Sequence, residues 1–99
     1  MSFQTVMKAA ADPTRRNILS LLKKGSLSAG EISEHFEMSK PAISQHLSQL
    51  REAGLVTCRK EGRSVIYELN TSAFEEVLIW IQDLIGEPHE KTIQNQQKI

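Results

Sequence analysis

Apolar residues recur every three or four positions through the first half of the chain, the spacing that places side chains on one face of an α-helix. From residue 55 the spacing changes to every second position, which is typical of β-strands, and helical spacing returns after residue 70. The pattern predicts a short helix over 3–10, helices over 14–24, from Ser28 and from Ser39 to about Ala53, then a β-hairpin and a last helix over 72–85.

Capping residues mark the expected helix ends. Asp12 before Pro13 favours a helix start, because Asp accepts hydrogen bonds from free amides of the first turn and Pro fits there. Ser28-x-x-Glu31 matches a capping box, and Ser72-x-x-Glu75 is a second match. Gly54 is expected to end the helix that Ser39 caps.

The segment 38–50 is the most informative one for function. Ile43, Leu47 and Leu50 form a narrow apolar stripe at helical spacing. The rest of the circumference is small or fork-tipped and polar: Lys40, Ser44, Gln45, His46, Ser48 and Gln49. Such side chains can exchange hydrogen bonds with DNA base edges and phosphates, whereas a plain solvated helix usually mixes Glu and Lys. An ordinary amphipathic surface helix is the alternative interpretation.

The predicted hairpin has strands Leu55–Lys60 and Val65–Leu69 joined by a turn over 61–64. Two helices joined by a tight turn and followed by a hairpin indicate a winged helix-turn-helix: mainly α, with a small β-hairpin wing. In this fold the second helix of the pair enters the major groove. We expect Arg59, Lys60 and Arg63 at phosphates or in the minor groove, with Gly62 letting the tip backbone approach the DNA.

The last predicted helix carries an apolar stripe that is too wide for one side of a small domain. Its members are Phe74, Val77, Leu78, Trp80, Ile81, Leu84 and Ile85. Beyond Pro88 the sequence is polar and rich in Gln. We therefore expect one domain over 1–86 and a flexible tail over 87–99.

Composition excludes several classes of protein. The 99 residues carry zero formal net charge, yet basic residues gather between Lys40 and Arg63 and acidic ones between Glu68 and Glu90, so we expect one basic end and one acidic end. A single cysteine, Cys58, excludes an internal disulfide framework. With no apolar run near the roughly 20 residues that span a bilayer and no signal-peptide blocks at the N-terminus, we expect a cytoplasmic protein without membrane insertion.

Three stretches together resemble the ArsR family of bacterial winged-helix repressors, and most of all its metal-independent, SdpR-like members. They are Ala11-Asp12-Pro13-Thr14-Arg15-Arg16-x-Ile18-Leu19-x-Leu21-Leu22, Ser39-x-Pro41-x-Ile43-Ser44-x-His46-Leu47-x-x-Leu50 and Ala53-Gly54-Leu55-Val56-x-x-Arg59-x-Glu61-Gly62-Arg63-x-x-x-Tyr67-x-Leu69. The likeness covers roughly residues 3–85.

The resemblance implies a homodimer built from the first and last helices. The residues it implies for the interface are Phe3, Val6, Met7, Phe74, Val77, Leu78, Trp80, Ile81 and Ile85. The alternative is that Trp80 and its neighbours complete the core of a monomer. A dimer would place two recognition helices about 34–36 Å apart and would require an inverted-repeat operator.

For DNA contact, the resemblance implies that Lys40, Ser44 and Gln45 face base edges, while His46 and Ser48 lie nearer the backbone. The full set expected to contact DNA on this helix is Ser39, Lys40, Pro41, Ser44, Gln45, His46 and Ser48. His46 could equally be a packing or capping residue. Arg15 and Arg16 could contact phosphate or form a solvated helix start.

The ligands of metal-sensing relatives are absent from the corresponding positions. Residues 31–36 contain no cysteine and the last helix contains no histidine, so we expect neither metal nor cofactor. The open alternatives are a shared site built from Asp83, Glu87, His89 and Glu90, and redox sensing by Cys58, which we expect to point inward.

The sequence thus predicts a DNA-binding transcriptional regulator, a dimeric repressor of its own or another promoter. Its expected partners are double-stranded DNA and a second copy of the chain, with a regulatory protein as a further candidate. A metal- or thiol-responsive sensor of the same fold and a winged-helix adaptor that binds protein are the alternatives. No phosphate loop, paired carboxylates or nucleophile–base spacing suggests an enzyme.

Overall fold

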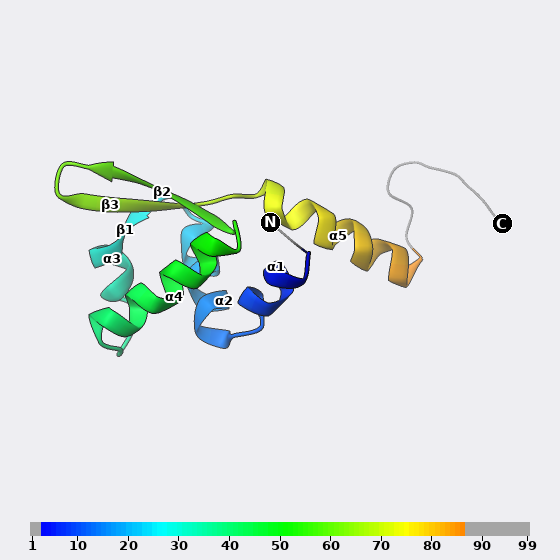
Figure 1. The fold of residues 1–99 in the computed structure, drawn as a ribbon, viewed down its shortest axis with the longest axis horizontal. Helices are drawn as coiled ribbons and strands as arrows, with labels where there is room; N and C mark the ends of the chain where they lie inside the picture. Colours follow the sequence, from blue (N-terminus) through cyan, green and yellow to red (C-terminus); the bar gives the residue numbers. More distant parts are fainter. Residues whose placement is uncertain (1–2, 87–99) are drawn as a thin grey trace.

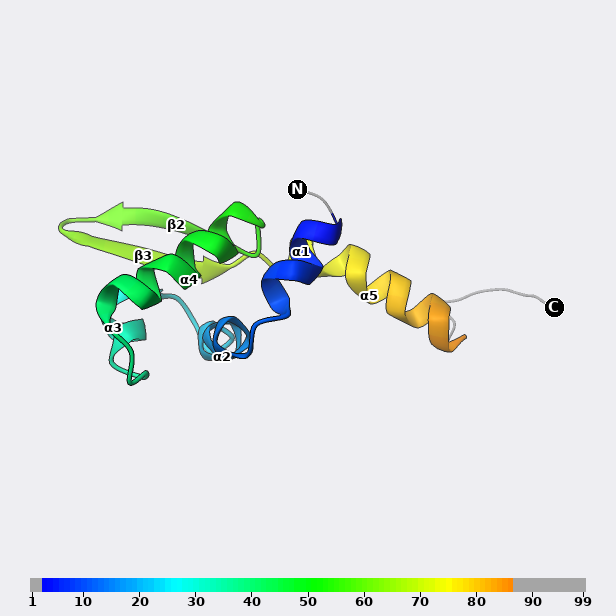
Figure 2. The same cartoon turned by 60° about the horizontal axis from the view of Figure 1, so that its bottom comes forward.

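The structure is a computed structural model that describes residues 3–86. The predicted tail, 87–99, lies outside the described residues. The elements follow one another as α1 (Phe3–Ala10), α2 (Pro13–Leu22), β1 (Leu27–Ser28), α3 (Ala29–Ser33), α4 (Lys40–Glu52), β2 (Val56–Glu61), β3 (Ser64–Leu69) and α5 (Ser72–Ile85). The hairpin of β2 and β3 extends from one end of the helical body and α5 from the other (Figures 1 and 2). None of the helices in this described part is long and apolar enough to cross a membrane.

One apolar core joins α1, α2, α3, α4 and the base of the hairpin. Its fully buried large side chains are Ile18, Ile32, Ile43, Leu47, Leu50, Leu55 and Val56. The stripe predicted for α4 is therefore confirmed, because Ile43, Leu47 and Leu50 all face this core. Leu19, Leu21, Phe36, Tyr67 and Leu69 are half-buried against it. The winged helix-turn-helix prediction is confirmed by this arrangement.

Three predicted helix starts are confirmed by their hydrogen bonds. The Asp12 carboxylate accepts from the Arg15 amide at 3.0 Å, and the Ser39 hydroxyl accepts from the Ala42 amide at 3.2 Å. Ser28 and Glu31 form the reciprocal pair of the predicted capping box, at 3.1 and 2.8 Å. These starts are local, so residues three positions apart were sufficient to predict them.

The second predicted capping box is wrong. Ser72 is the first residue of α5, the cap position is Thr71, and no side chain caps the helix. Backbone contacts form this start instead: Ala73 donates to Asn70 and Phe74 to Thr71. Asn70 is itself fixed by two bonds, from its amide to the Leu55 carbonyl at 2.9 Å and from its side chain to the Gly54 carbonyl at 2.8 Å.

The sheet has three antiparallel strands in the order β1-β3-β2. The sequence pattern missed β1, whose two residues, Leu27 and Ser28, pair with Tyr67 and Ile66. The hairpin strands are shifted from the predicted bounds because Glu61 and Ser64 pair directly. The tip is therefore a two-residue turn with Gly62 at φ +62°, a left-handed conformation that Gly adopts without strain.

Helix α4 ends in a Schellman motif, which connects it to β2 without a loop. The Leu55 amide donates to the Leu50 carbonyl and the Gly54 amide to the Arg51 carbonyl, both at 3.0 Å. Gly54 has φ +79°, as this motif requires. Leu50 and Leu55 are both fully buried. The end of the recognition helix and the start of the wing thus belong to one packed unit.

Candidate nucleic-acid interface

The outward side of α4 carries the predicted polar face. Lys40, Ser44, Gln45 and Ser48 are exposed, whereas the apolar stripe of the same helix is buried. Ser39 and Pro41 are also exposed and form the start of the helix. Amides at a helix N-terminus attract anions such as phosphate. The side chains on this face offer donors and acceptors suited to base edges.

Short helix α3 precedes α4 and packs against it. Its single buried residue, Ile32, anchors it in the core. The link between them carries Met38, which is exposed. Helix α3, this link and α4 form the helix-turn-helix, whose second helix lies alongside the hairpin in both views (Figures 1 and 2).

The tip of the wing presents the basic residues unequally. Lys60 and Arg63 are exposed, and within the described residues 3–86 neither makes an ion pair. Arg59 instead bonds the carboxylates of Glu61 at 2.7 Å and Glu68 at 3.4 Å. These contacts, chiefly the bond to Glu61, raise the pKa of Arg59 above its usual value. Sequence reasoning had treated the three cations alike, and the structure separates Arg59 from the other two.

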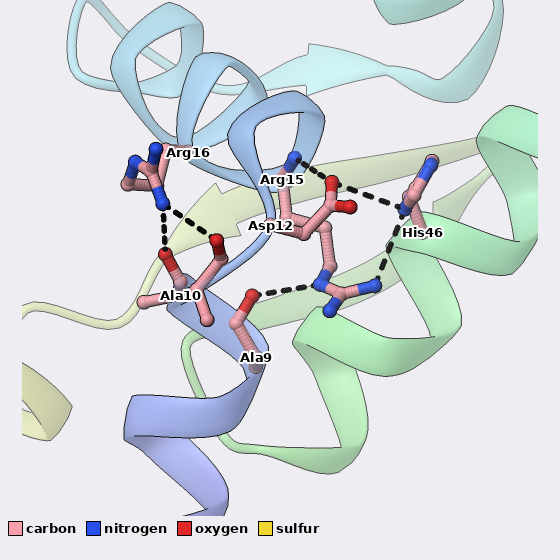
Figure 3. Close-up of polar contacts among 7 residues, drawn as sticks. Ala9, Ala10, Asp12, Arg15, Arg16 and His46 are labelled. Carbon is pink, nitrogen blue, oxygen red and sulfur yellow. Dashed lines mark hydrogen bonds and ion pairs between the residues drawn. The ribbon is translucent and has the colours of Figure 1, made fainter.

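His46 lies at the edge of the buried stripe and faces α2 rather than open solvent (Figure 3). Its Nδ1 is 3.4 Å from Arg15 Nη1 and 3.8 Å from the Asp12 carboxylate, and its side chain is 18% exposed. These contacts favour the packing role that the sequence left open. The hydrogen bond from the Arg15 amide is the main cause of a lowered pKa at Asp12, and the charge of Arg15 acts in the same direction.

Arg15 and Arg16 both bond backbone carbonyls near the end of α1 (Figure 3). Arg15 Nε donates to the Ala9 carbonyl at 2.7 Å. Arg16 Nη1 donates to the Ala10 and Ala11 carbonyls at 2.9 and 2.8 Å. Arg16 is exposed and Arg15 half-buried, so the two neighbours differ in how far they reach into the protein.

A second surface is apolar and lies on α5 and α1. The exposed large hydrophobic residues there are Met7, Leu78, Ile79, Trp80, Ile81, Leu84 and Ile85. Of the residues expected at a dimer interface, Val6 is a core residue at 4% exposure, while Phe74 and Val77 are half-buried against the core. Ile79 and Leu84 were not among the residues expected at the interface. Leu84 does belong to the wide apolar stripe predicted for the last helix, and Ile79 does not.

The residues considered for metal or redox chemistry are dispersed. In the part of the chain that the structure describes, no three His, Cys, Asp or Glu residues are grouped to hold a metal ion. His89 and Glu90 lie outside the described residues. Cys58 is half-buried and pairs across the sheet with Tyr67, and burial is the main cause of a raised pKa at that Tyr67.

Comparison with known proteins agrees with this geometry. Residues 12–57 match the family model described as bacterial regulatory protein, arsR family. The chain is 44% identical over 81 residues to the transcriptional repressor SdpR of Bacillus subtilis, covering 82% of this chain and 90% of that protein. It is 44% identical over 66 residues to an arsenical resistance operon repressor of Staphylococcus xylosus, covering 67% and 64%. A crystal structure of a possible transcriptional regulator for arsenical resistance superposes with a TM-score of 0.74 at 37% identity, covering 84% of this chain and 85% of that one.

Proposed function

Because the chain belongs to the ArsR family of bacterial regulatory proteins, we propose that this DNA-binding transcriptional regulator is a dimeric repressor of an inverted-repeat operator. The family consists of regulators and not enzymes, and the chain is not an enzyme. The observation that carries the proposal is the exposed Ser, Gln and Lys face of α4 beside a wing tip whose Lys60 and Arg63 make no ion pair within residues 3–86. A repressor built this way would act on promoter DNA in the cytoplasm.

The dimer is supported by the apolar surface of α5 and α1. Leu84 and Ile85 are 66% and 63% exposed, which is unfavourable for large aliphatic side chains in water. Monomeric proteins rarely expose contiguous apolar patches of this kind. A second copy, packed through the same helices, would bury the patch in an interface with two-fold symmetry. Two recognition helices related by that symmetry would read the two halves of a palindrome.

The exposed side chains divide into those that would contact base edges and those that would contact phosphates. Gln45 can form a bidentate pair with adenine, and Lys40 can reach guanine. Arg63 and Lys60 at the wing tip would bind phosphates, which adds affinity without sequence preference. Arg59 contributes less, because Glu61 and Glu68 already neutralise it. Ser44 and Ser48 complete the polar face between these contacts.

We assign the protein to the metal-independent repressors of the family. Helix α3 and the residues that follow it carry Glu31 and His35 where a cysteine box would be needed, and the last helix has no histidine. The DNA upstream of the protein's own gene is the first operator that we would examine, since autoregulation requires no separate inducing ligand.

One binding experiment tests the proposal. Operator DNA is selected from a random pool, and fluorescence anisotropy then gives the affinity of the wild-type protein and of Gln45→Ala at two salt concentrations. Gln49→Ala is the matched control, because Gln49 lies on the same helix but lines a hollow against α1 and α2. We expect Gln45→Ala to cost about 1–3 kcal/mol at one base pair of each half-site and Gln49→Ala to bind normally. Failure of the wild-type protein to select any DNA would refute the function.

Added Zn²⁺ separates the two kinds of repressor. A metal-independent repressor keeps its affinity for the selected operator at all Zn²⁺ concentrations that leave the protein folded. Release of the operator on adding Zn²⁺, reversed by a chelator, would assign the protein to the metal sensors instead.

A further inference from the structure

Arg15 connects three helices at one corner of the core (Figure 3). It lies in the first turn of α2, where its amide bonds the capping carboxylate of Asp12. Its Nε donates to the Ala9 carbonyl in the last turn of α1 at 2.7 Å. Its Nη1 lies 3.4 Å from Nδ1 of His46 in the middle of α4. A single guanidinium therefore links the helix that carries part of the apolar surface to the helix that carries the polar face.

The chemistry of the pair fixes which atom donates. A guanidinium has donors and no acceptor, so in this contact Arg15 is the donor and Nδ1 of His46 is the acceptor. Asp12 lies 3.8 Å from the same nitrogen, on the other side of the contact. The planar fork of Arg15 meets two acceptors from two different nitrogens, Nε and Nη1, whereas the donors of a lysine ammonium all lie on one nitrogen.

Apolar packing alone does not determine the angle of α4 at this corner. Beside Arg15 the three helices leave a hollow lined by Gln4, Lys8 and Gln49, among others. Hydrophobic contacts are non-directional, so where they leave a gap a helix can tilt or rotate at low cost. Hydrogen bonds have preferred distances and angles, and Arg15, which lines this hollow, makes such bonds to both α1 and α4.

Building on the proposed function, we propose that Arg15 is a positioning residue that holds α4 at a set orientation to α1, and so sets the spacing of the recognition helices in the dimer. Helix α1 carries Met7 of the apolar surface, with Phe3 packed against Trp80, and α4 carries Ser44 and Gln45 of the polar face. A change of angle between them moves the polar face of each subunit relative to the two-fold axis. The preferred separation of operator half-sites then changes with it.

The competing role for Arg15 is a direct phosphate contact, and the salt dependence of binding distinguishes the two. A phosphate contact contributes about 0.9 to the slope of log affinity against log salt in each subunit, and it strengthens binding to every DNA sequence. A positioning residue leaves that slope unchanged and affects DNA with the correct half-site spacing most.

The variant Arg15→Gln removes the charge and reports the salt slope, whereas Arg15→Lys keeps the charge and removes the fork. Arg16→Lys is the matched control for Arg15→Lys, because Arg16 bonds the Ala10 and Ala11 carbonyls and, within residues 3–86, has no hydrogen bond to α4. Each is titrated against the selected operator, against the same operator with one base pair added to or removed from its centre, and against unrelated DNA. We expect Arg15→Lys to lose about tenfold on the native spacing, the effect of one mismatched base pair, with unrelated DNA unchanged, and Arg15→Gln to leave the salt slope unchanged.

A second pair of variants changes the other end of the contact. His46→Asn keeps an acceptor near the position of Nδ1 and should retain the spacing preference. His46→Leu keeps a buried side chain without the acceptor and should reproduce the loss seen in Arg15→Lys. If circular dichroism shows that Arg15→Lys does not fold, the two His46 variants still test the proposal.

Orientation can be measured without DNA. Residual dipolar couplings of backbone amides report the angle between α1 and α4 in the wild-type protein and in each folded variant. A changed angle in Arg15→Lys or His46→Leu, and none in Arg16→Lys, supports the proposal even if the wild-type protein selects no operator. An unchanged angle overturns it, and so does a uniform loss on all DNA with a reduced salt slope in Arg15→Gln.

Discussion

The ring of Phe3 in α1 packs edge-on against the indole of Trp80 in α5, with centroids 5.4 Å apart and planes at 73°. Such edge-to-face pairs add about 0.5–1.5 kcal/mol beyond the area they bury. The pair joins the two helices that carry the exposed apolar surface. Yet Trp80 remains 43% exposed, and Leu78, Leu84 and Ile85 are more exposed still. The contact therefore orients α5 against α1 and leaves most of its apolar face uncovered.

Leu84→Glu should convert the dimer into a monomer, because a carboxylate in the middle of an apolar interface has no partner and loses its hydration. Sedimentation equilibrium at micromolar concentration measures this directly. Ser72→Glu is the matched control, because it adds the same charge to the same helix at an exposed polar position outside the apolar surface. A monomeric wild-type protein, or equal effects of the two substitutions, would contradict the proposed interface.

Arg63→Ala and Arg59→Ala should differ in their effect on DNA binding. Replacing Arg63 removes an unpaired cation from the wing tip and should lower the salt slope by about two per dimer. Replacing Arg59 removes a cation already bonded to Glu61 and Glu68, so the slope should change less. Anisotropy titrations at four salt concentrations provide both slopes. A larger change for Arg59→Ala would mean that the wing ion pairs open when DNA binds.

Asp12→Asn should reduce the free energy of unfolding at neutral pH but not at acid pH. Asparagine caps a helix about as well as aspartate, so the cap is kept and the charge is removed. The pKa of Asp12 is lowered in the folded protein, so its charge stabilises the fold above the unfolded carboxyl pKa of about 3.9 and this contribution is lost as the pH falls below it. Urea unfolding gives the free energy of unfolding of both proteins. Asp12→Asn should be less stable than the wild type at pH 6, and the difference should be smaller at pH 3. A difference of the same size at both would contradict the assignment.

Two glycine substitutions should have opposite effects on stability. Gly62→Ala places a Cβ at φ +62° in the wing turn and should cost about 1–2 kcal/mol. Gly30→Ala lies in helix α3, where the new Cβ would meet no atom closer than the Ser28 hydroxyl at 3.9 Å. It should stabilise the protein by up to about 1 kcal/mol, because it restricts the unfolded chain. Thermal unfolding midpoints compare the pair, and shifts in the same direction would disagree with both backbone arguments.

What could be predicted from sequence was local. The caps at Asp12 and Ser39 and the buried stripe of α4 depend on residues within a few positions of one another. The two-residue strand β1 exists because Leu27 meets Tyr67, a partner too distant in sequence for a period-2 pattern to reveal. The start of α5 likewise depends on Asn70 reaching Gly54 rather than on a capping box.

The same limit applies to the functional surfaces. Lys40, Gln45 and Arg63 could be predicted as exposed, because helical spacing and turn position place them outside the core. The ion pairs of Arg59 and the contact between Arg15 and His46 join different elements, so no local pattern contains them. Val6 was assigned to an interface because the family resemblance implied one on the first helix, and its burial became evident only once α1 was packed in the fold.

The Schellman motif at Gly54 removes the one place where a hinge between recognition helix and wing could have formed. Leu50 and Leu55, on either side of Gly54, are joined by a backbone hydrogen bond and are both fully buried. Because the recognition helix and the wing move as one unit, the protein cannot adjust their relative position to a DNA groove of different shape. The duplex therefore has to bend or twist to fit. The stiffness of DNA depends on its base steps. Operators should therefore be discriminated also at base pairs that no side chain contacts, through how readily they deform.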